Sequence, residues 1–152
     1  MKLALAGAGA FGRKHLDSVA AIDGAEVVTL VDPTPGLAQQ VADERGIANA
    51  VTSLDDALAD PAVDAVILAT PTPMHAGQAI ACLEAGKHVE VEIPMADSIA
   101  DARAVVETQE RTGLVAMVGH TRRFNPSHQW VHHKIQAGDF NIQQMDVQTF
   151  FF

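Results

Sequence analysis

A glycine-rich segment near the N-terminus has the residue types and spacing of a phosphate-binding turn. Gly7, Gly9 and Gly12 form a G-x-G-x-x-G pattern directly after a short apolar run. Gly7 permits a tight turn, Gly9 leaves room for a pyrophosphate, and Gly12 allows a following helix to pack closely on the strand. The backbone amides at the start of that helix, near Ala10 and Phe11, would then face the phosphate charge.

An acidic residue stands where a bound dinucleotide would place its adenosine ribose. Asp32 follows the β-branched run 26–31 and lies 20 residues after Gly12. A carboxylate there accepts hydrogen bonds from both ribose hydroxyls, which favours NAD, and it repels the additional phosphate of NADP. The structural alternative is an Asp that opens a turn before Pro33. With the glycines, Asp32 predicts a nicotinamide dinucleotide cofactor, NAD or NADP, with NAD favoured.

These residues need a parallel sheet to bring them to one edge. Short apolar runs alternate with helical patterns, and we expect strands over 2–6, 26–31, 49–52, 63–69, 88–91 and 114–118. We expect helices over 11–22, 36–45 and 74–85, a brief one opened by a capping box of Ser53 and Asp56, and a long one from 97 or 98 to 112. Strands that alternate with crossover helices predict an α/β fold with a doubly wound parallel sheet, the Rossmann fold.

The pattern changes after Gly119. A polar, basic stretch leads to an expected helix over 126–137, and an alternating segment over 142–152 ends the sequence. We predict a dinucleotide-binding Rossmann domain over 1–121, then a linker helix and the first strand of a truncated second α+β domain over 122–152. The alternative is a natural C-terminal edge strand. A truncated chain is expected to bind a dinucleotide without turning over substrate.

Composition narrows the class of protein. The 152 residues are 48% hydrophobic, enough for one ordinary globular domain. With 19 acidic residues against 10 Lys and Arg, the formal charge of −9 argues against nucleic-acid and anionic-membrane partners. The single Cys82 cannot form an internal disulfide and is expected in the core. The apolar run after Met1 is too short for a signal core or a membrane span, so we expect a cytoplasmic protein.

Three further motifs follow the glycines in order. They are Thr70-Pro71-Thr72-Pro73-Met74-His75, Glu90-Val91-Glu92-Ile93-Pro94 and Arg122-Arg123-Phe124-Asn125-Pro126. Together with the glycines they resemble the Gfo/Idh/MocA oxidoreductase family over nearly the whole chain. The resemblance implies an NAD(P)-dependent dehydrogenase that acts on a small molecule, and we expect it to be a homo-oligomer.

The same resemblance adds cofactor-binding candidates. In the family, the loop after the fourth strand passes over the dinucleotide, which implicates Thr70, Pro71, Thr72 and His75. His75 is also a candidate proton acceptor by its position at the carboxyl edge of the sheet.

The family's Glu-Lys-Pro tripeptide, which lies near the nicotinamide, matches Glu92, Ile93 and Pro94. Its Lys commonly assists proton transfer at the substrate hydroxyl, whereas Ile93 can neither donate nor accept a proton. The usual alcohol-to-ketone catalysis is therefore not expected from this position.

The segment 119–130 resembles one branch of the family, which oxidises a carboxylated hemiacetal and is associated with NADP. That association conflicts with Asp32, and both cofactors stay open. Arg122 or Arg123 could pair with a substrate carboxylate in bidentate fashion, or could instead form ion pairs that hold the linker. Arg122 and His120 are the catalytic candidates, and a small carboxylated molecule is the expected substrate.

Two other readings remain open. His128 and His132 are spaced four apart, but no Glu follows His128 as in a His-Glu-x-x-His zinc site, so we predict no metal. The missing Lys and the abrupt end at Phe152 suit a non-catalytic dinucleotide-binding module. A weaker alternative is a structural fragment that self-associates through its terminal strand.

Overall fold

The computed structural model describes residues 1–144 and 146. The chain divides into two compact units, Met1–Gly119 and His120–Phe152, and each is described by itself.

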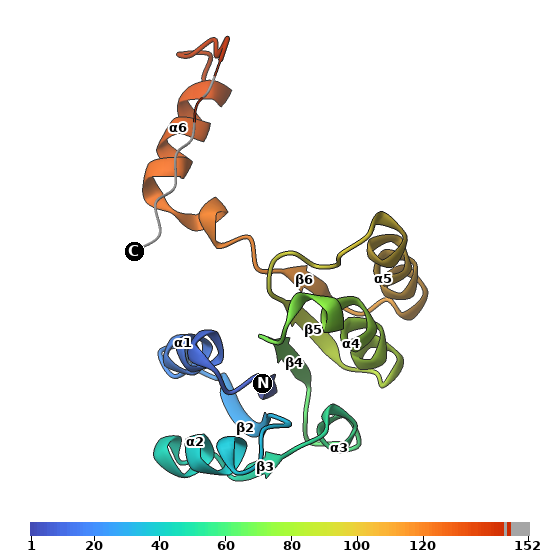
Figure 1. The fold of residues 1–152 in the computed structure, drawn as a ribbon. Coiled ribbons are helices and arrows are strands. Elements are labelled where there is room, and N and C mark those ends of the chain that lie inside the picture. The colour runs from blue at the N-terminus through green and yellow to red at the C-terminus, as the bar shows by residue number, and fades with distance from the viewer. Residues whose placement is uncertain (145, 147–152) are drawn as a thin grey trace. The chain divides into compact units, whose positions relative to one another are not determined.

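The first unit is built on a parallel sheet (Figure 1). In the described residues its strands are β1 (Lys2–Ala6), β2 (Glu26–Val31), β3 (Asn49–Val51), β4 (Ala65–Leu68), β5 (His88–Val91) and β6 (Ala116–Val118). Their order is β3-β2-β1-β4-β5-β6, and every neighbouring pair is parallel. The chain therefore winds outward in two directions from β1 and β4, and such a switch point opens a crevice at the carboxyl ends of the two strands.

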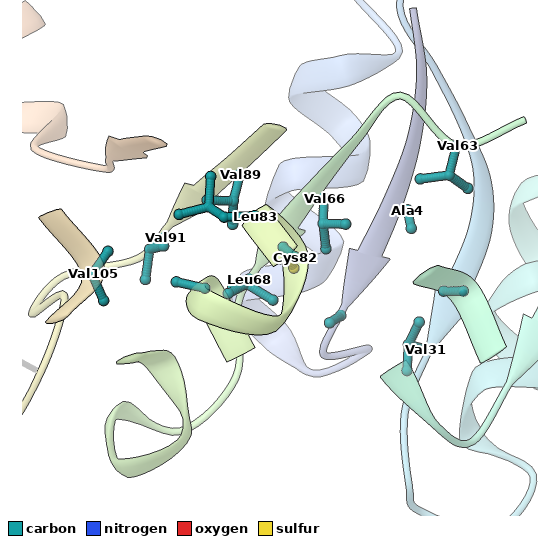
Figure 2. Close-up of a cluster of buried hydrophobic side chains, with 13 residues drawn as sticks. Ala4, Val31, Val63, Val66, Leu68, Cys82, Leu83, Val89, Val91 and Val105 are labelled. Carbon is teal, nitrogen blue, oxygen red and sulfur yellow. The ribbon is translucent and has the colours of Figure 1, made fainter. Parts of the chain in front are cut away.

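Helices cover both faces of this sheet. The helices are α1 (Ala10–Val19), α2 (Leu37–Arg45), α3 (Leu54–Leu58), α4 (Thr72–Glu84) and α5 (Ile99–Thr112). Apolar residues of α1 and α2 form one hydrophobic cluster with one face of the sheet. Apolar residues of α3, α4 and α5 form a second cluster with the other face, which Figure 2 shows. The predicted α/β class with a doubly wound parallel sheet is confirmed.

Successive side chains of a strand point to opposite faces of the sheet, so alternate residues of one strand join different hydrophobic clusters. Leu3 and Leu5 of β1 join the cluster with α1 and α2, whereas Ala4 and Ala6 join the cluster with α3 to α5. Cys82 of α4 is fully buried in the second cluster, as expected, and burial raises the pKa of its thiol to about 12. The thiol therefore stays neutral and acts as a small apolar side chain.

Capping residues fix several helix starts. The Ser98 hydroxyl accepts the Asp101 N–H and donates to the Asp101 carboxylate, so Ser98 rather than Asp97 opens α5. Ser53 caps α3 by accepting the Asp55 N–H, two residues along, so the predicted partner Asp56 was one residue too far. Helix α4 begins at Thr72, two residues before the predicted start, because a proline in the first helical turn needs no hydrogen-bond acceptor.

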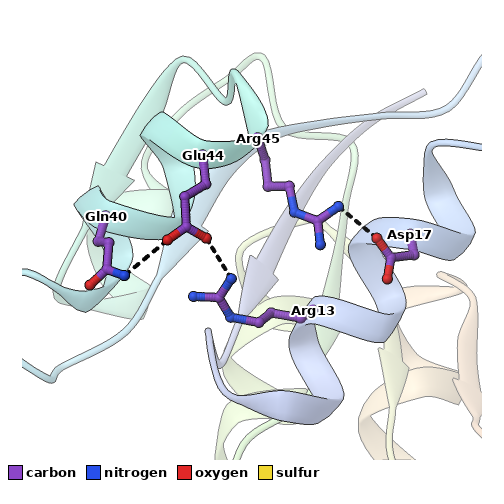
Figure 3. A network of polar contacts seen from close by, with 5 residues as sticks. All are labelled: Arg13, Asp17, Gln40, Glu44 and Arg45. Carbon is purple, nitrogen blue, oxygen red and sulfur yellow. Dashed lines mark hydrogen bonds and ion pairs between the residues drawn. The ribbon is translucent and has the colours of Figure 1, made fainter.

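Surface ion pairs join α1 to α2 (Figure 3). Arg13 lies 2.6 Å from Glu44, and Arg45 lies 2.6 Å from Asp17. The Gln40 amide also donates to Glu44. Exposed pairs of this kind contribute little to stability. They connect the two helices that follow β1 and β2.

The second unit contains a 3-10 helix, η1 (Thr121–Phe124), followed by α6 (Pro126–Gln136). The Asn125 side chain caps α6 by accepting the Ser127 N–H. Trp130 packs edge-to-face on Phe140, with ring centroids 5.9 Å apart. The alternating segment over 142–152 was expected to contain the first strand of a second domain, at 148–152, and these residues lie outside the described part of the chain. Within the described chain, no helix has the length and apolar character needed to cross a membrane.

Candidate functional site

A cavity of about 620 Å³ opens at the switch point between β1 and β4. Five of the predicted cofactor-binding residues line it: Gly7, Gly9, Asp32, Thr70 and Pro71. They come from the turns after β1, β2 and β4, because parallel strands deliver their carboxyl ends to one edge. The rest of the lining was not predicted and comes from the start of α3 and from one side of α4, including Thr52, Ser53, Leu54, Asp55, Met74, Gly77, Gln78 and Ala81.

The three glycines of the turn have different structural roles. Gly7 has a φ of +101°, and a Cβ there would lie 2.4 Å from the Ala69 carbonyl oxygen. A Cβ on Gly12 would lie 1.8 Å from the Gly7 carbonyl oxygen. Gly9 is different, because a Cβ there meets nothing within 4 Å. Gly7 and Gly12 are therefore required by the fold, whereas the space above Gly9 is open to a ligand.

Helix α1 starts directly after this turn. Gly9 is its N-cap, and Ala10 and Phe11 are its first two residues. Phe11 is exposed, so its contribution at this position is its backbone amide rather than its ring. The first amides of a helix carry no intrahelical partner and attract anions. The start of α1 therefore fits the pyrophosphate role that the glycines predict.

Asp32 is held rigidly at the end of β2. Its carboxylate accepts the Ala8 N–H and the Thr34 N–H, both at 2.9 Å. Burial acts to raise the pKa of Asp32, but the Ala8 and Thr34 hydrogen bonds outweigh burial and lower it below its ordinary value. Asp32 is therefore a fixed anion. The charged side chains of the described lining are Asp32 and Asp55, with no Lys or Arg, which disfavours the extra phosphate of NADP.

His75, a predicted cofactor-binding residue, is buried beside the cavity-lining loop. It is 1% exposed on α4 and does not line the cavity. Its Nδ1 lies 2.8 Å from the Pro94 carbonyl oxygen, and its Nε2 lies 2.7 Å from the Thr70 carbonyl oxygen. Both ring nitrogens thus lie within hydrogen-bond distance of backbone carbonyl oxygens. His75 joins the loop after β4 to the loop after β5.

The Glu92-Ile93-Pro94 tripeptide follows β5. Glu92 Oε1 lies 2.8 Å from Nε2 of His15 on α1, and Glu92 Oε2 accepts the Ile93 N–H at 3.3 Å. The Ile93 side chain is about half exposed. His15 was not singled out in the sequence, and its one signal is that it lies on the helix that starts at the glycine turn. This pair ties the middle of α1 to the residue that follows β5.

Glu90 is a second residue to which the sequence analysis assigned no role. Its Oε2 is buried and, within the described residues, has no hydrogen-bond partner. Burial raises the pKa of Glu90, the neighbouring Glu92 raises it further, and His15 and His75 oppose the shift. A Cβ on Gly119 would lie 2.7 Å from Glu90 Oε1, so this glycine leaves the room that the carboxyl occupies. The available signal was an acid between Val89 and Val91 in an apolar strand.

Glu90→Gln is expected to stabilise the protein more at pH 8 than at pH 5. A raised folded-state pKa means that Glu90 contributes stability below its unfolded-state pKa and loses it as pH rises through the folded-state value. Glutamine keeps the shape of the neutral carboxyl and does not ionise. Thermal unfolding at both pH values measures the difference, and Glu110→Gln on the exposed side of α5 is the control. Equal shifts for both variants at both pH values would contradict the burial argument.

The candidates beyond β6 belong to the second unit. Arg122 and Arg123 line a cavity of about 510 Å³ with His128, Gln129 and His132 of α6. His120 is exposed and precedes η1, where its carbonyl accepts the Arg123 N–H. In the part of the chain that the structure describes, no three His, Cys, Asp or Glu side chains gather as metal ligands.

Comparison with known proteins decides the family. Residues 1–120 match the oxidoreductase family with an NAD-binding Rossmann fold, Gfo/Idh/MocA. The chain belongs to the Gfo/Idh/MocA family. Residues 126–152 match the C-terminal region of bacterial oxidoreductases. The predicted family resemblance is confirmed, and with it an NAD-binding oxidoreductase domain.

Two curated relatives of this Gfo/Idh/MocA chain are named as dehydrogenases. A 4-carboxy-2-hydroxymuconate-6-semialdehyde dehydrogenase of Sphingobium sp. (strain NBRC 103272 / SYK-6) is 62% identical over all of this chain and 48% of its own length. A scyllo-inositol 2-dehydrogenase (NAD(+)) of Bacillus subtilis (strain 168) is 36% identical over 91% of this chain and 41% of its own length. The chain therefore spans less than half the length of these curated relatives.

A solved structure shows the same fold in a relative with its cofactor. The WlbA dehydrogenase from Bordetella pertussis, in complex with NADH and UDP-GlcNAcA, superposes with a TM-score of 0.86 at 34% identity. The match covers 91% of this chain and 43% of that one.

Proposed function

We propose that this chain is the cofactor-binding part of a dehydrogenase that prefers NAD to NADP. The observation that carries the proposal is the fixed anionic carboxylate of Asp32, in a cavity whose described lining holds no cation. The adenosine ribose hydroxyls donate to such a carboxylate, and a 2′-phosphate would be repelled by it. NAD, when bound, supplies the ring carbon that accepts a hydride.

We assign the three parts of the cofactor to three groups of described residues. The pyrophosphate is assigned to the turn and helix start, Gly7, Gly9, Ala10, Phe11 and Gly12. The adenosine side is assigned to Asp32 and to the loop Thr70, Pro71 and Thr72. The nicotinamide side is assigned to Glu92, Ile93 and Pro94. His75 holds the adenosine and nicotinamide groups in place, because its ring contacts the backbone of Thr70 in one and of Pro94 in the other.

The proposed substrate is a carboxylated semialdehyde that reacts as its cyclic hemiacetal. The relative at 62% identity is named for 4-carboxy-2-hydroxymuconate-6-semialdehyde, which supports this class. The hemiacetal carbon gives a hydride to NAD⁺ and the hydroxyl gives up a proton, so that a lactone, NADH and H⁺ result. Ile93 cannot take that proton. We assign proton acceptance to His120 and carboxylate binding to Arg122.

An activity assay of the complete gene product tests this assignment. With NAD⁺ and the semialdehyde, we expect reduced nicotinamide to form, and Arg122→Ala to raise KM about tenfold through loss of a charge-assisted pair. His120→Gln is expected to lower kcat at unchanged KM, because it removes the proton acceptor. Turnover that both variants leave unchanged would overturn the residue assignment.

A non-catalytic dinucleotide-binding module is the second candidate. The observation that favours it is Ile93, which replaces the residue that supports proton transfer in the family. Saturable NADH binding by a complete gene product without turnover on any carboxylated semialdehyde would support this alternative. A cytoplasmic location and a homo-oligomer remain predictions.

A further inference from the structure

In the unit His120–Phe152, the described residues that line a second cavity are all hydrogen-bond donors. The volume of this cavity is about 510 Å³, and these residues are Arg122, Arg123, His128, Gln129 and His132. Guanidinium groups only donate, an imidazole donates in every charge state, and the Gln amide donates through its nitrogen. The described lining contains no carboxylate.

Residues 120–138, which supply the described lining of this cavity, carry a positive charge, opposite to that of the whole chain. The protein has a formal charge of −9, yet residues 120–138 contain no Asp or Glu. Four of the seven His residues also fall in this stretch. An acidic protein repels anions at long range, whereas a cavity lined by cationic side chains attracts them locally.

The start of α6 determines which side chains face the cavity. Asn125 caps the helix, and Pro126 occupies its first turn, so the helix begins at a defined residue. His128 and His132 are then four residues apart and share one helix face. Both line the cavity, whereas the adjacent His133 does not. The helix thus presents two imidazoles on the side where the arginines of η1 also lie.

An anion fits these residues better than a metal does. Two His at this spacing can hold a metal, but the described residues supply no third ligand nearby. Two guanidinium groups in the same lining would repel a cation. Carboxylates, by contrast, pair with guanidinium in bidentate geometry and accept hydrogen bonds from imidazole and amide N–H groups.

We propose that this cavity binds a ligand with two carboxylates, one held by the arginines of η1 and the other by His128, Gln129 and His132 of α6. The volume and the two separate donor groups exceed what one carboxylate occupies. The inference rests on the proposed function, because it assigns a site to both carboxylates of that substrate class. It adds residues of α6 that the proposed function does not use.

Calorimetric titration of the chain with isophthalate, a rigid dicarboxylate, tests the proposal, with benzoate as the single-carboxylate comparison. We expect saturable isophthalate binding that is about tenfold tighter than benzoate binding. Arg123→Gln is expected to weaken isophthalate binding about tenfold, and His132→Gln about threefold.

Two matched controls separate the site from general charge effects. Lys134→Gln removes the same charge as Arg123→Gln, but Lys134 pairs with Asp139 outside the cavity. His133→Gln makes the same change as His132→Gln one residue away from the lining. Both controls are expected to leave isophthalate affinity unchanged.

The outcomes distinguish this proposal from the proposed function. Absent isophthalate binding, equal affinity for benzoate, or equal losses in the two controls would each overturn the dicarboxylate site. NADH titration of the same proteins reports on the Asp32 cavity alone. NADH binding without isophthalate binding leaves the cofactor assignment standing, and isophthalate binding without NADH binding leaves the dicarboxylate site standing.

Discussion

Gly12→Ala is expected to lower the free energy of unfolding by about 3 kcal/mol and to abolish NADH binding. A Cβ on Gly12 would lie 1.8 Å from the Gly7 carbonyl oxygen, which is backbone and cannot rotate away. Relief requires α1 to move off β1, and that movement opens the turn that faces the cavity. Urea unfolding followed by circular dichroism measures the loss of stability, and fluorescence titration measures the loss of binding.

Gly9→Ala is the matched control for this change. Gly9 has a φ of −72°, and a Cβ there meets nothing within 4 Å. We expect its stability to stay within about 1 kcal/mol of the original chain, since alanine is compatible with this backbone. NADH affinity should still fall at least about tenfold, because the methyl group occupies the approach of the pyrophosphate. Equal unfolding midpoints for the two variants would contradict the packing role of Gly12.

Asp32→Ala has the second largest expected effect. We expect NADH affinity to fall about 10- to 100-fold, because the ribose hydroxyls lose their charged acceptor. Stability should also fall by about 1–3 kcal/mol, because the buried Ala8 N–H loses its partner. The lowered pKa of Asp32 contributes stability above its unfolded-state value and loses it as pH falls through the folded-state value. The variant should therefore lose less stability on acidification.

Asp55→Asn tests whether charge alone explains that result. Asp55 is the other charged residue of the cavity lining, and its side chain is exposed at the start of α3. Its removal changes the net charge as Asp32→Ala does, without breaking the bonds to Ala8 and Thr34. We expect a change in NADH affinity of less than about threefold. A loss as large as that of Asp32→Ala would show that long-range charge, rather than the Asp32 hydrogen bonds, controls binding.

The sequence was informative wherever local chemistry decides the structure. Strands β2 and β5 have their predicted bounds because turn-forming residues flank them: Gly24 and Pro33 on either side of β2, and Gly86 before β5. Gly7, Gly9 and Asp32 reach one cavity because each follows a parallel strand. Strand β4 is shorter than its apolar run 63–69, because hydrophobicity reports burial and not the end of the hydrogen-bond ladder.

The contacts that could not be predicted are those between distant residues. His15 and Glu92 are 77 positions apart, and no local pattern pairs them. His75 looked like a ligand residue because it lies at the correct edge of the sheet. Its direction is set by the carbonyl groups of Thr70 and Pro94, which only the folded loops bring together. The residues at the start of α3 that line the cavity could not be predicted either, because their position depends on how α3 packs on the sheet.

The central claim is that Asp32 makes the β1–β4 cavity an NAD site. Fluorescence titration of the unmodified chain with NADH and, separately, with NADPH tests it most directly. We expect saturable NADH binding that is at least about tenfold tighter than NADPH binding, because a 2′-phosphate would meet the Asp32 carboxylate. NADPH binding as tight as NADH binding would contradict the role assigned to Asp32, and absence of binding by either would contradict the site itself.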